Sequence, residues 1–242
     1  MRIALKALKA ILLWPFVCKN WWVGVFSYLG LTSGNKEVLY RLRSGLDLEA
    51  SGDSGDFQIV KEVFLHKSYL KFIDLPTIKT VVDLGAHKGF VTTQFAQKLG
   101  SVVRILSVEP EPNNFKHLQR NVRKNGFSKQ VIMQNCAVYT KDDYLTLYTT
   151  SYTPGHSMYK ELQKGKKKKI QVPCYSLKTL MKEHRFKEID ILKIDIEGAE
   201  YEIIFNLEQS ILDHIKYIVM ECHKIDAYNV NDMVTYLGKK GF

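Results

Sequence analysis

Five short apolar segments of the chain are each followed at once by side chains that can ionise or form several hydrogen bonds. If these segments are strands of a parallel sheet, their carboxyl ends meet at one edge, where ligands bind in such folds. An unpaired charge costs on the order of several kcal/mol to bury, so these residues are better candidates for a site than for a core. They are Asp83, Glu109, Asn135, Asp195 with Glu197, and Glu221 with His223.

The first of these residues leads into the turn Gly85-Ala86-His87-Lys88-Gly89. The dinucleotide fingerprint GxGxxG needs glycines at its first, third and sixth positions, and the second glycine here stands at the fifth, which argues against hydride chemistry. The spacing DxGxxxG, with Glu109 coming 26 residues after Asp83, matches instead a site for S-adenosylmethionine. The glycines let the backbone approach a cofactor, and Glu109 can accept hydrogen bonds from both ribose hydroxyls.

A second group of candidates follows the fourth and fifth apolar segments. In extended backbone Lys193, Asp195 and Glu197 point to the same side. We expect Asp195 or His223 to take the proton from a hydroxyl acceptor, with Lys193 holding Asp195 ionised. Two alternatives stay open, because Asp195 can serve only the cofactor or the helix start, and Lys193 can be only a structural ion-pair partner.

The elements that must position these residues alternate between short apolar strands and longer helices. This rhythm predicts an α/β fold with a mostly parallel, doubly wound sheet and right-handed crossovers. Upstream, the pattern predicts a strand over 38–48 and a helix over 57–70 that Asp56 caps. The expected strands of the sheet are 79–84, 102–108, 131–137, 189–194 and 215–220, and the helices are 90–99, 112–124, 176–184 and 199–205.

Composition and charge limit the class of protein. Of the 242 residues 45% are hydrophobic and 25% are charged, as in a folded domain. The net charge of +10 sits mainly in residues 1–43, with seven basic side chains against one acid, and in five lysines within 164–169. The rest is nearly neutral, so nucleic acid is not an expected partner. The four cysteines form no CxxC pair, which predicts no metal site and a reducing, cytoplasmic compartment.

The first part of the chain is apolar and basic. Its longest uncharged run, 20–35, has 16 residues, whereas a spanning helix needs about 20. Lysines ahead of an apolar stretch resemble a signal peptide, but no small-x-small cleavage site follows before Trp21 and Trp22. Two interpretations of residues 1–31 stay open: a helix docked on the flank of the domain, or peripheral contact with a membrane interface.

The sequence resembles a known family, the FkbM-type S-adenosylmethionine-dependent methyltransferases. The likeness extends over nearly the whole chain, and its most specific part is the KIDIEGAE block. The N-terminal part contributes KNWW, LGL, YRLRSGLDL and the pair Glu62 and Tyr69. The four main blocks are VVDLGAHKGF (81–90), SVEPEPNNF (107–115), LKIDIEGAEYEII (192–204) and VMECH (219–223).

This resemblance implies a Rossmann-like class I methyltransferase fold and methylation of a hydroxyl on a sugar, glycan or related small molecule. It divides the chain into an N-terminal helical arm (1–37), a strand–helix extension (38–76) and a methyltransferase domain (77–242) with an insertion at 149–171. The family closes its sheet with an antiparallel strand pair, which we expect to be missing here. The implied cofactor residues are Asp83, Gly85, Ala86, His87, Gly89, Phe90, Glu109, Asn135 and Ala137.

Two other functions remain as alternatives. An RNA methyltransferase would use the basic arm and the lysine run, and its binding would depend steeply on salt. A non-catalytic membrane or partner adaptor on the same fold would bind no S-adenosylmethionine. Since fold alone does not determine function, the site must discriminate between them.

Overall fold

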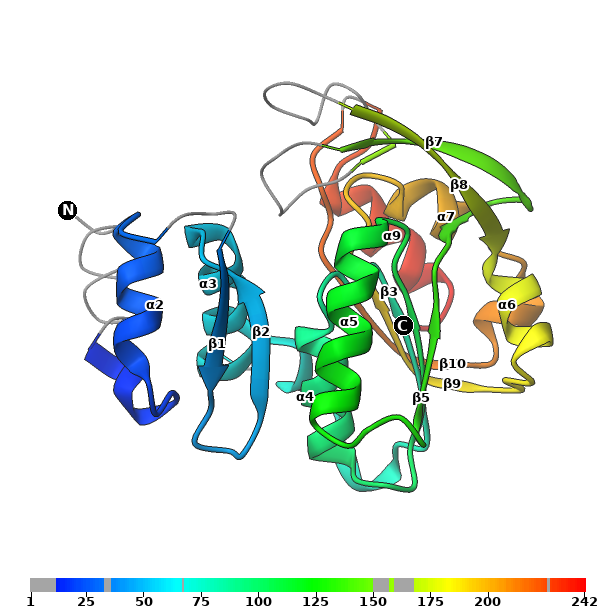
Figure 1. Cartoon of the computed structure of the whole chain (residues 1–242). Coiled ribbons are helices and arrows are strands. Elements are labelled where there is room, and N and C mark those ends of the chain that lie inside the picture. Colours follow the sequence, from blue (N-terminus) through cyan, green and yellow to red (C-terminus); the bar gives the residue numbers. More distant parts are fainter. Residues whose placement is uncertain (1–11, 33–35, 67, 150–156, 159–167, 226) are drawn as a thin grey trace.

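The structure is a computed structural model that describes residues 12–32, 36–66, 68–149, 157–158, 168–225 and 227–242 (Figure 1). The first eleven residues of the N-terminal arm lie outside the described residues. Most of the expected insertion, with the first three lysines of its lysine run, also lies outside them. In the part of the chain that is described, no helix is both long and apolar enough to cross a membrane.

A five-stranded parallel sheet forms the centre of the protein, in the order β10-β9-β3-β4-β5. The chain runs outward from β3 to β5, then returns to β9 beside β3 and continues to β10, so the direction of winding switches between β3 and β9. This confirms the predicted doubly wound sheet. The strands are β3 (Thr80–Leu84), β4 (Arg104–Val108), β5 (Val131–Gln134), β9 (Ile189–Ile194) and β10 (Ile215–Met220).

Helices cover both faces of this sheet (Figure 1). Val81 packs in a core with α4 and α5, whereas its neighbour Val82 packs in a second core with α6, α7 and α9, because successive strand residues point to opposite faces. In the described residues β10 is followed by α9 and pairs only with β9, so no antiparallel pair closes the sheet. The helices are α4 (Phe90–Leu99), α5 (Pro112–Lys124), α6 (Leu177–Glu183), α7 (Glu200–Phe205), α8 (Gln209–Leu212) and α9 (Val230–Lys239).

Two of the predicted strands are wrong in extent. The segment 38–48 is not one strand but part of a hairpin, β1 (Glu37–Arg41) and β2 (Asp47–Ser51), whose turn includes Gly45 at φ 97°. The segment 131–137 breaks after β5. Its last residue begins β6 (Ala137–Tyr139), in a separate sheet with β7 (Asp143–Thr149) and β8 (Lys168–Ser176). Ser44-Gly45 and Gln134-Asn135 lie at the two breaks, and the prediction did not treat these residues as the ends of strands.

The predicted helix 57–70 also differs. An α-helix, α3 (Ser54–Lys61), begins three residues earlier and passes into a π-helical turn, η2 (Glu62–His66), and a 3₁₀ turn, η3 (Ser68–Leu70). Its N-cap is Asp53, whose carboxylate accepts from the backbone N–H of Asp56 (3.0 Å), so the prediction that Asp56 caps the helix is wrong. π-helical turns are rare and often lie at functional sites.

The N-terminal elements form a module that packs beside α4 and α5. It contains η1 (Trp14–Phe16), α2 (Trp21–Tyr28), the β1–β2 hairpin and α3, and η4 (Leu75–Thr77) leads from it into β3. Its own core is aromatic, with Trp14 edge-on to Phe57 at 5.2 Å between ring centroids. The side-chain amide of Asn121 on α5 completes the contact, accepting from the backbone of Glu49 (2.7 Å) and donating to it (2.9 Å).

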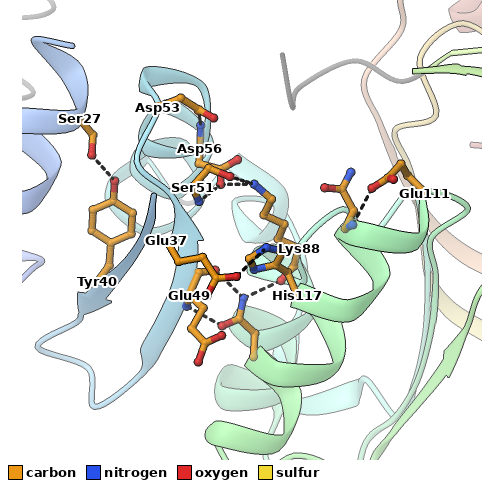
Figure 2. A network of polar contacts seen from close by, with 12 residues as sticks. Ser27, Glu37, Tyr40, Glu49, Ser51, Asp53, Asp56, Lys88, Glu111 and His117 are labelled. Atoms are coloured by element: carbon orange, nitrogen blue, oxygen red, sulfur yellow. Dashed lines mark hydrogen bonds and ion pairs between the residues drawn. The ribbon is translucent and has the colours of Figure 1, made fainter. Parts of the chain in front are cut away.

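A buried ion pair anchors this module to the loop after β3. The ammonium of Lys88 bonds the carboxylate of Asp56 and the hydroxyl of Ser51, and both charged side chains are almost fully buried (Figure 2). A buried ion pair is strongly destabilising to break because the remaining charge has no compensation. The position of α3 is therefore tied to the same loop that carries Gly85.

Gly85 is required where β3 meets β9. Its φ of 77° lies in the left-handed region, and a Cβ atom there would be 1.8 Å from the carbonyl oxygen of Asp195. The N–H groups of Gly85 and Ala86 both donate to the carbonyl of Val108 (3.0 and 2.9 Å), which closes the loop over β4. Only a residue without a side chain fits this position.

Replacing Gly85 with alanine should lower the free energy of unfolding by roughly 3 kcal/mol or more, because backbone strain adds to a steric clash. Gly126 is a matched control, since its φ is 76° and nothing lies within 4 Å of its would-be Cβ. G126A should lose only about 1–2 kcal/mol from backbone strain. Urea unfolding followed by circular dichroism measures both, and equal losses would show that the contact with Asp195 does not restrict Gly85.

Replacing Asp56 with alanine should cost about 3–5 kcal/mol, because it leaves the ammonium of Lys88 buried and unpaired. The exposed pair between Lys178 and Glu208 is the control, and K178A should leave the unfolding midpoint unchanged. The same urea experiment checks both variants. A D56A protein as stable as the wild type would contradict the anchoring role of this ion pair.

Candidate functional site

A pocket of about 300 Å³ lies where the winding of the sheet switches direction. The residues that follow β3, β4, β9 and β10 form its floor, as expected for ligand binding at the carboxyl ends of parallel strands. The module adds a wall from α3 and η2, and β6 and β7 add another. The pocket therefore combines segments from most of the chain.

One half of the pocket contains a single buried carboxylate, Glu109, beside an apolar wall. Glu109 is 5% exposed, and its two oxygens accept from the backbone N–H groups of His87 (2.8 Å) and Glu111 (2.9 Å). Burial raises the pKa of this carboxyl to about 7. Each oxygen keeps a further lone pair for a ligand. The adjacent apolar lining comes from Phe90, Val91, Val108, Pro110, Cys136, Ala137 and Val138.

Lys193 holds the two halves of the pocket together. It is 1% exposed, donates to the carbonyl of Gly85 (2.7 Å), and lies 3.1 Å from the carboxylate of Asp83 and 3.8 Å from that of Asp195. Burial opposes its charge, but Asp83 and Asp195 outweigh this effect and raise the pKa of the ammonium. Lys193 therefore keeps its proton and acts as a fixed positive charge.

The other half of the pocket is rich in carboxylates. A carboxylate oxygen of Asp195, a carboxylate oxygen of Glu197 and a ring nitrogen of His223 all lie within 4.8 Å of one another. Glu221 and Glu62 line the same region. Burial raises the pKa of Glu197 to about 7, and the neighbouring Asp195 adds to this rise. Glu197 also has a left-handed backbone at φ 58°, a strained conformation for a residue with a side chain.

The imidazole of His223 lies between two carboxylates. Its Nδ1 donates to buried Glu200 (2.8 Å), and its Nε2 is 3.3 Å from Glu197. Burial disfavours its charge, but the bond to Glu200 and the charge of Glu197 raise its pKa to about 9. The backbone N–H of Gly198 in turn donates to Glu200 (2.9 Å). His223 is therefore an imidazolium at neutral pH.

The N-terminal module reaches this second half through Tyr69, whose phenol donates to Asp195 (3.4 Å). Burial and the charge of Asp195 raise the pKa of the phenol, so it keeps its proton. Sequence reasoning gave Tyr69 no role of its own, because a contact between residues 126 positions apart leaves no local signal. Gln58 and Ile59 of the same wall were missed, and Glu62 was named only as part of the family resemblance, without a place in the site.

The structure brings most of the sequence-predicted site residues to the pocket. Three of them, Asp83, Asn135 and Gly89, do not line it. Asp83 binds Lys193 and accepts a hydrogen bond from Thr92. Asn135 donates to the carbonyl of Glu109 (2.7 Å), and Gly89 packs against Leu118. These three shape the loops behind the pocket. The predicted residues that do line it are Gly85, Ala86, His87, Phe90, Glu109, Ala137, Lys193, Asp195 and His223.

Comparison with curated proteins finds methyltransferases. The chain is 27% identical over 181 residues to "Methyltransferase 1" of Beauveria bassiana, covering 67% of this chain and 72% of that protein. It is 24% identical over 232 residues to "31-O-demethyl-FK506 methyltransferase FkbM" of Streptomyces tacrolimicus, covering 84% and 87%.

Among solved structures, a methyltransferase FkbM from Methylobacillus flagellatus superposes with a TM-score of 0.47 at 15% identity, covering 76% of this chain and 46% of that one. The family model described as "Methyltransferase FkbM domain" matches residues 83–242, which is more than half of the chain. That segment contains all five strands of the central sheet except the first residues of β3, and it contains the three strand ends whose carboxylates, Glu109, Asp195 and Glu221, line the pocket. The protein therefore belongs to the FkbM methyltransferase family and uses S-adenosylmethionine as its cofactor.

Proposed function

We propose that the protein methylates a hydroxyl group on a sugar, a glycan or a related small molecule. The observation that carries this proposal is the carboxylate cluster beside Lys193, directly next to the half of the pocket that suits the cofactor. S-adenosylmethionine supplies an activated methyl group, so the protein must align the acceptor oxygen and accept its proton. A hydroxyl acceptor needs such a base, and carboxylates at this position can provide it.

The residues of the first half fit S-adenosylmethionine. The free lone pairs of Glu109 suit the two ribose hydroxyls, and the apolar wall around Phe90 and Val108 suits the adenine ring. The loop from Gly85 to His87 lines the same pocket and would hold the remaining part of the cofactor through its backbone. Lys193 keeps this loop at a constant distance from Asp195.

Asp195 is the proposed proton acceptor. Its carboxylate lines the same pocket as the Gly85 loop and accepts a hydrogen bond from the phenol of Tyr69 (3.4 Å), which orients it. His223 is not suited to be the base at neutral pH, because its pKa of about 9 keeps it protonated. It can instead donate a hydrogen bond to the acceptor. Glu197, with its pKa of about 7, is a second carboxylate able to take a proton.

The negative charge of the carboxylate-rich half of the pocket, which we call the acceptor half, also favours some substrates over others. Glu62, Asp195, Glu197 and Glu221 line it, so a phosphate backbone would be repelled, whereas hydroxyl groups can donate to these oxygens. This counts against the RNA methyltransferase alternative. The fit of the first half to S-adenosylmethionine counts against a non-catalytic adaptor.

Cofactor affinity should depend on the ionisation of Glu109. The carboxyl is protonated below its pKa of about 7 and ionised above it, so S-adenosylhomocysteine should bind more tightly at pH 8 than at pH 6. E109Q should bind about 10–100-fold more weakly at pH 8 and lose this pH dependence, since a hydrogen bond to a charged group is lost. Isothermal titration calorimetry measures both, with E208Q as the control. An E109Q protein that binds like the wild type would remove Glu109 from the cofactor site.

Turnover should depend on Asp195. With a panel of hydroxylated sugars as acceptors and S-adenosylhomocysteine release as the readout, D195N should lower kcat at least 100-fold, as general-base loss does. Its affinity for the cofactor should stay within about threefold of the wild type. E197Q is the matched comparison. If D195N retains full turnover and E197Q does not, the base is Glu197 and the assignment to Asp195 is wrong.

A further inference from the structure

Exposed hydrophobic side chains are concentrated at one end of the protein. Of the fourteen large hydrophobic residues that are exposed in the described part of the chain, eight lie in the short stretch between residues 12 and 31. Contiguous exposed apolar surface marks an interaction site. We call these eight residues the N-terminal apolar patch: Leu12, Leu13, Phe16, Trp21, Trp22, Phe26, Leu29 and Leu31.

The patch is exposed although α2 is packed, because the opposite face of α2 contacts α3 and β1. Gly24 and Ser27 of α2 are buried. A Cβ atom at Gly24 would lie 2.5 Å from the ring of Phe57 on α3. Trp22 and Phe26, four residues apart, stay 49% and 46% exposed. In Figure 1 α2 lies on the side of α3 and the β1–β2 hairpin that faces away from the central sheet.

Basic side chains border the patch. Lys19, Arg41 and Arg43 are exposed, and the guanidinium of Arg43 donates to the carbonyl of Pro15 (2.7 Å), next to Phe16, which is 77% exposed. The backbone N–H of Lys19 donates to the carbonyl of Arg41 (2.7 Å), so these bases lie on adjoining segments. Glu37, the one acid among the described residues from 12 to 43, is bound by Arg120 of α5 (2.6 Å).

We propose that the N-terminal apolar patch binds the surface of a lipid bilayer that contains anionic lipids. Tryptophan and phenylalanine enter the boundary between headgroups and acyl chains, and lysine and arginine beside them attract anionic headgroups. A second copy of the chain is a poorer occupant, because a symmetric interface through this patch would place the basic borders of both copies near each other. The patch then lies in the boundary between headgroups and acyl chains at the bilayer surface.

The three tryptophans of the chain make binding directly visible. Trp14 is fully buried in the module, so a change in tryptophan emission on mixing with vesicles reports Trp21 and Trp22. The full chain should co-sediment with vesicles of 70% phosphatidylcholine and 30% phosphatidylglycerol, with a blue shift and with quenching by brominated acyl chains. Binding should be much weaker to pure phosphatidylcholine and at high salt.

Variants separate the apolar and the basic contributions. W22S/F26S should weaken partitioning at least tenfold, and K19E/R43E should weaken it by about fivefold or more for each base. V234S, at an exposed position on α9, should bind like the wild type. Circular dichroism and cofactor binding of each variant check that it folds, and both are independent of the acceptor proposed above.

Absence of co-sedimentation with the anionic vesicles at low salt would overturn the proposal. So would binding that W22S/F26S leaves unchanged. A dimer seen by sedimentation velocity that W22S/F26S dissociates, in a protein that does not bind vesicles, would assign the patch to a second copy instead.

Discussion

The site depends on the buried ammonium group of Lys193, which joins the two central strands at the point where the winding of the sheet reverses. It binds the Gly85 carbonyl and Asp83 on one side and lies 3.8 Å from Asp195 on the other. A charge this deeply buried is stable only while its partners stay in place. The distance between the cofactor loop and the proposed base is therefore constrained by an interaction that any opening of β3 from β9 would break.

The N-terminal module is part of the site and not an appendage to it. Lys88, in the same loop as Gly85, binds Asp56 of the module, so the cofactor loop and α3 are held in one arrangement. The π-helical turn after α3 then brings Glu62 into the pocket wall, and Tyr69 beyond it reaches Asp195. The family match begins at residue 83, yet this wall of the pocket comes from residues before it. Because α2 packs on α3, the apolar patch and the pocket share one supporting helix.

The two halves of the pocket differ in how they handle charge. Glu109 is the single carboxylate of the half with the apolar wall, whereas the carboxylate-rich half groups several carboxylates around the imidazolium of His223. Within that group both pKa values rise: burial raises the pKa of Glu197 to about 7, and, against the effect of burial, the hydrogen bond to Glu200 with the charge of Glu197 raises that of His223 to about 9.

The sequence by itself determined the parallel sheet, its main helices and the residues at its carboxyl edge, because apolar runs and the residues that end them are local signals. It also determined that the turn beginning at Gly85 and the carboxylate of Glu109 belong to the site. It did not determine the hairpin at 37–51, the break after residue 134 or the π-helical turn, because the point where a strand ends and the partner it pairs with depend on tertiary contacts. Only the tertiary structure decided that Tyr69 meets Asp195, that Asp83 and Asn135 support the pocket from behind, and that His223 is held as an imidazolium by Glu200. These are contacts between distant segments, and their energies depend on burial and distance, which no local pattern encodes.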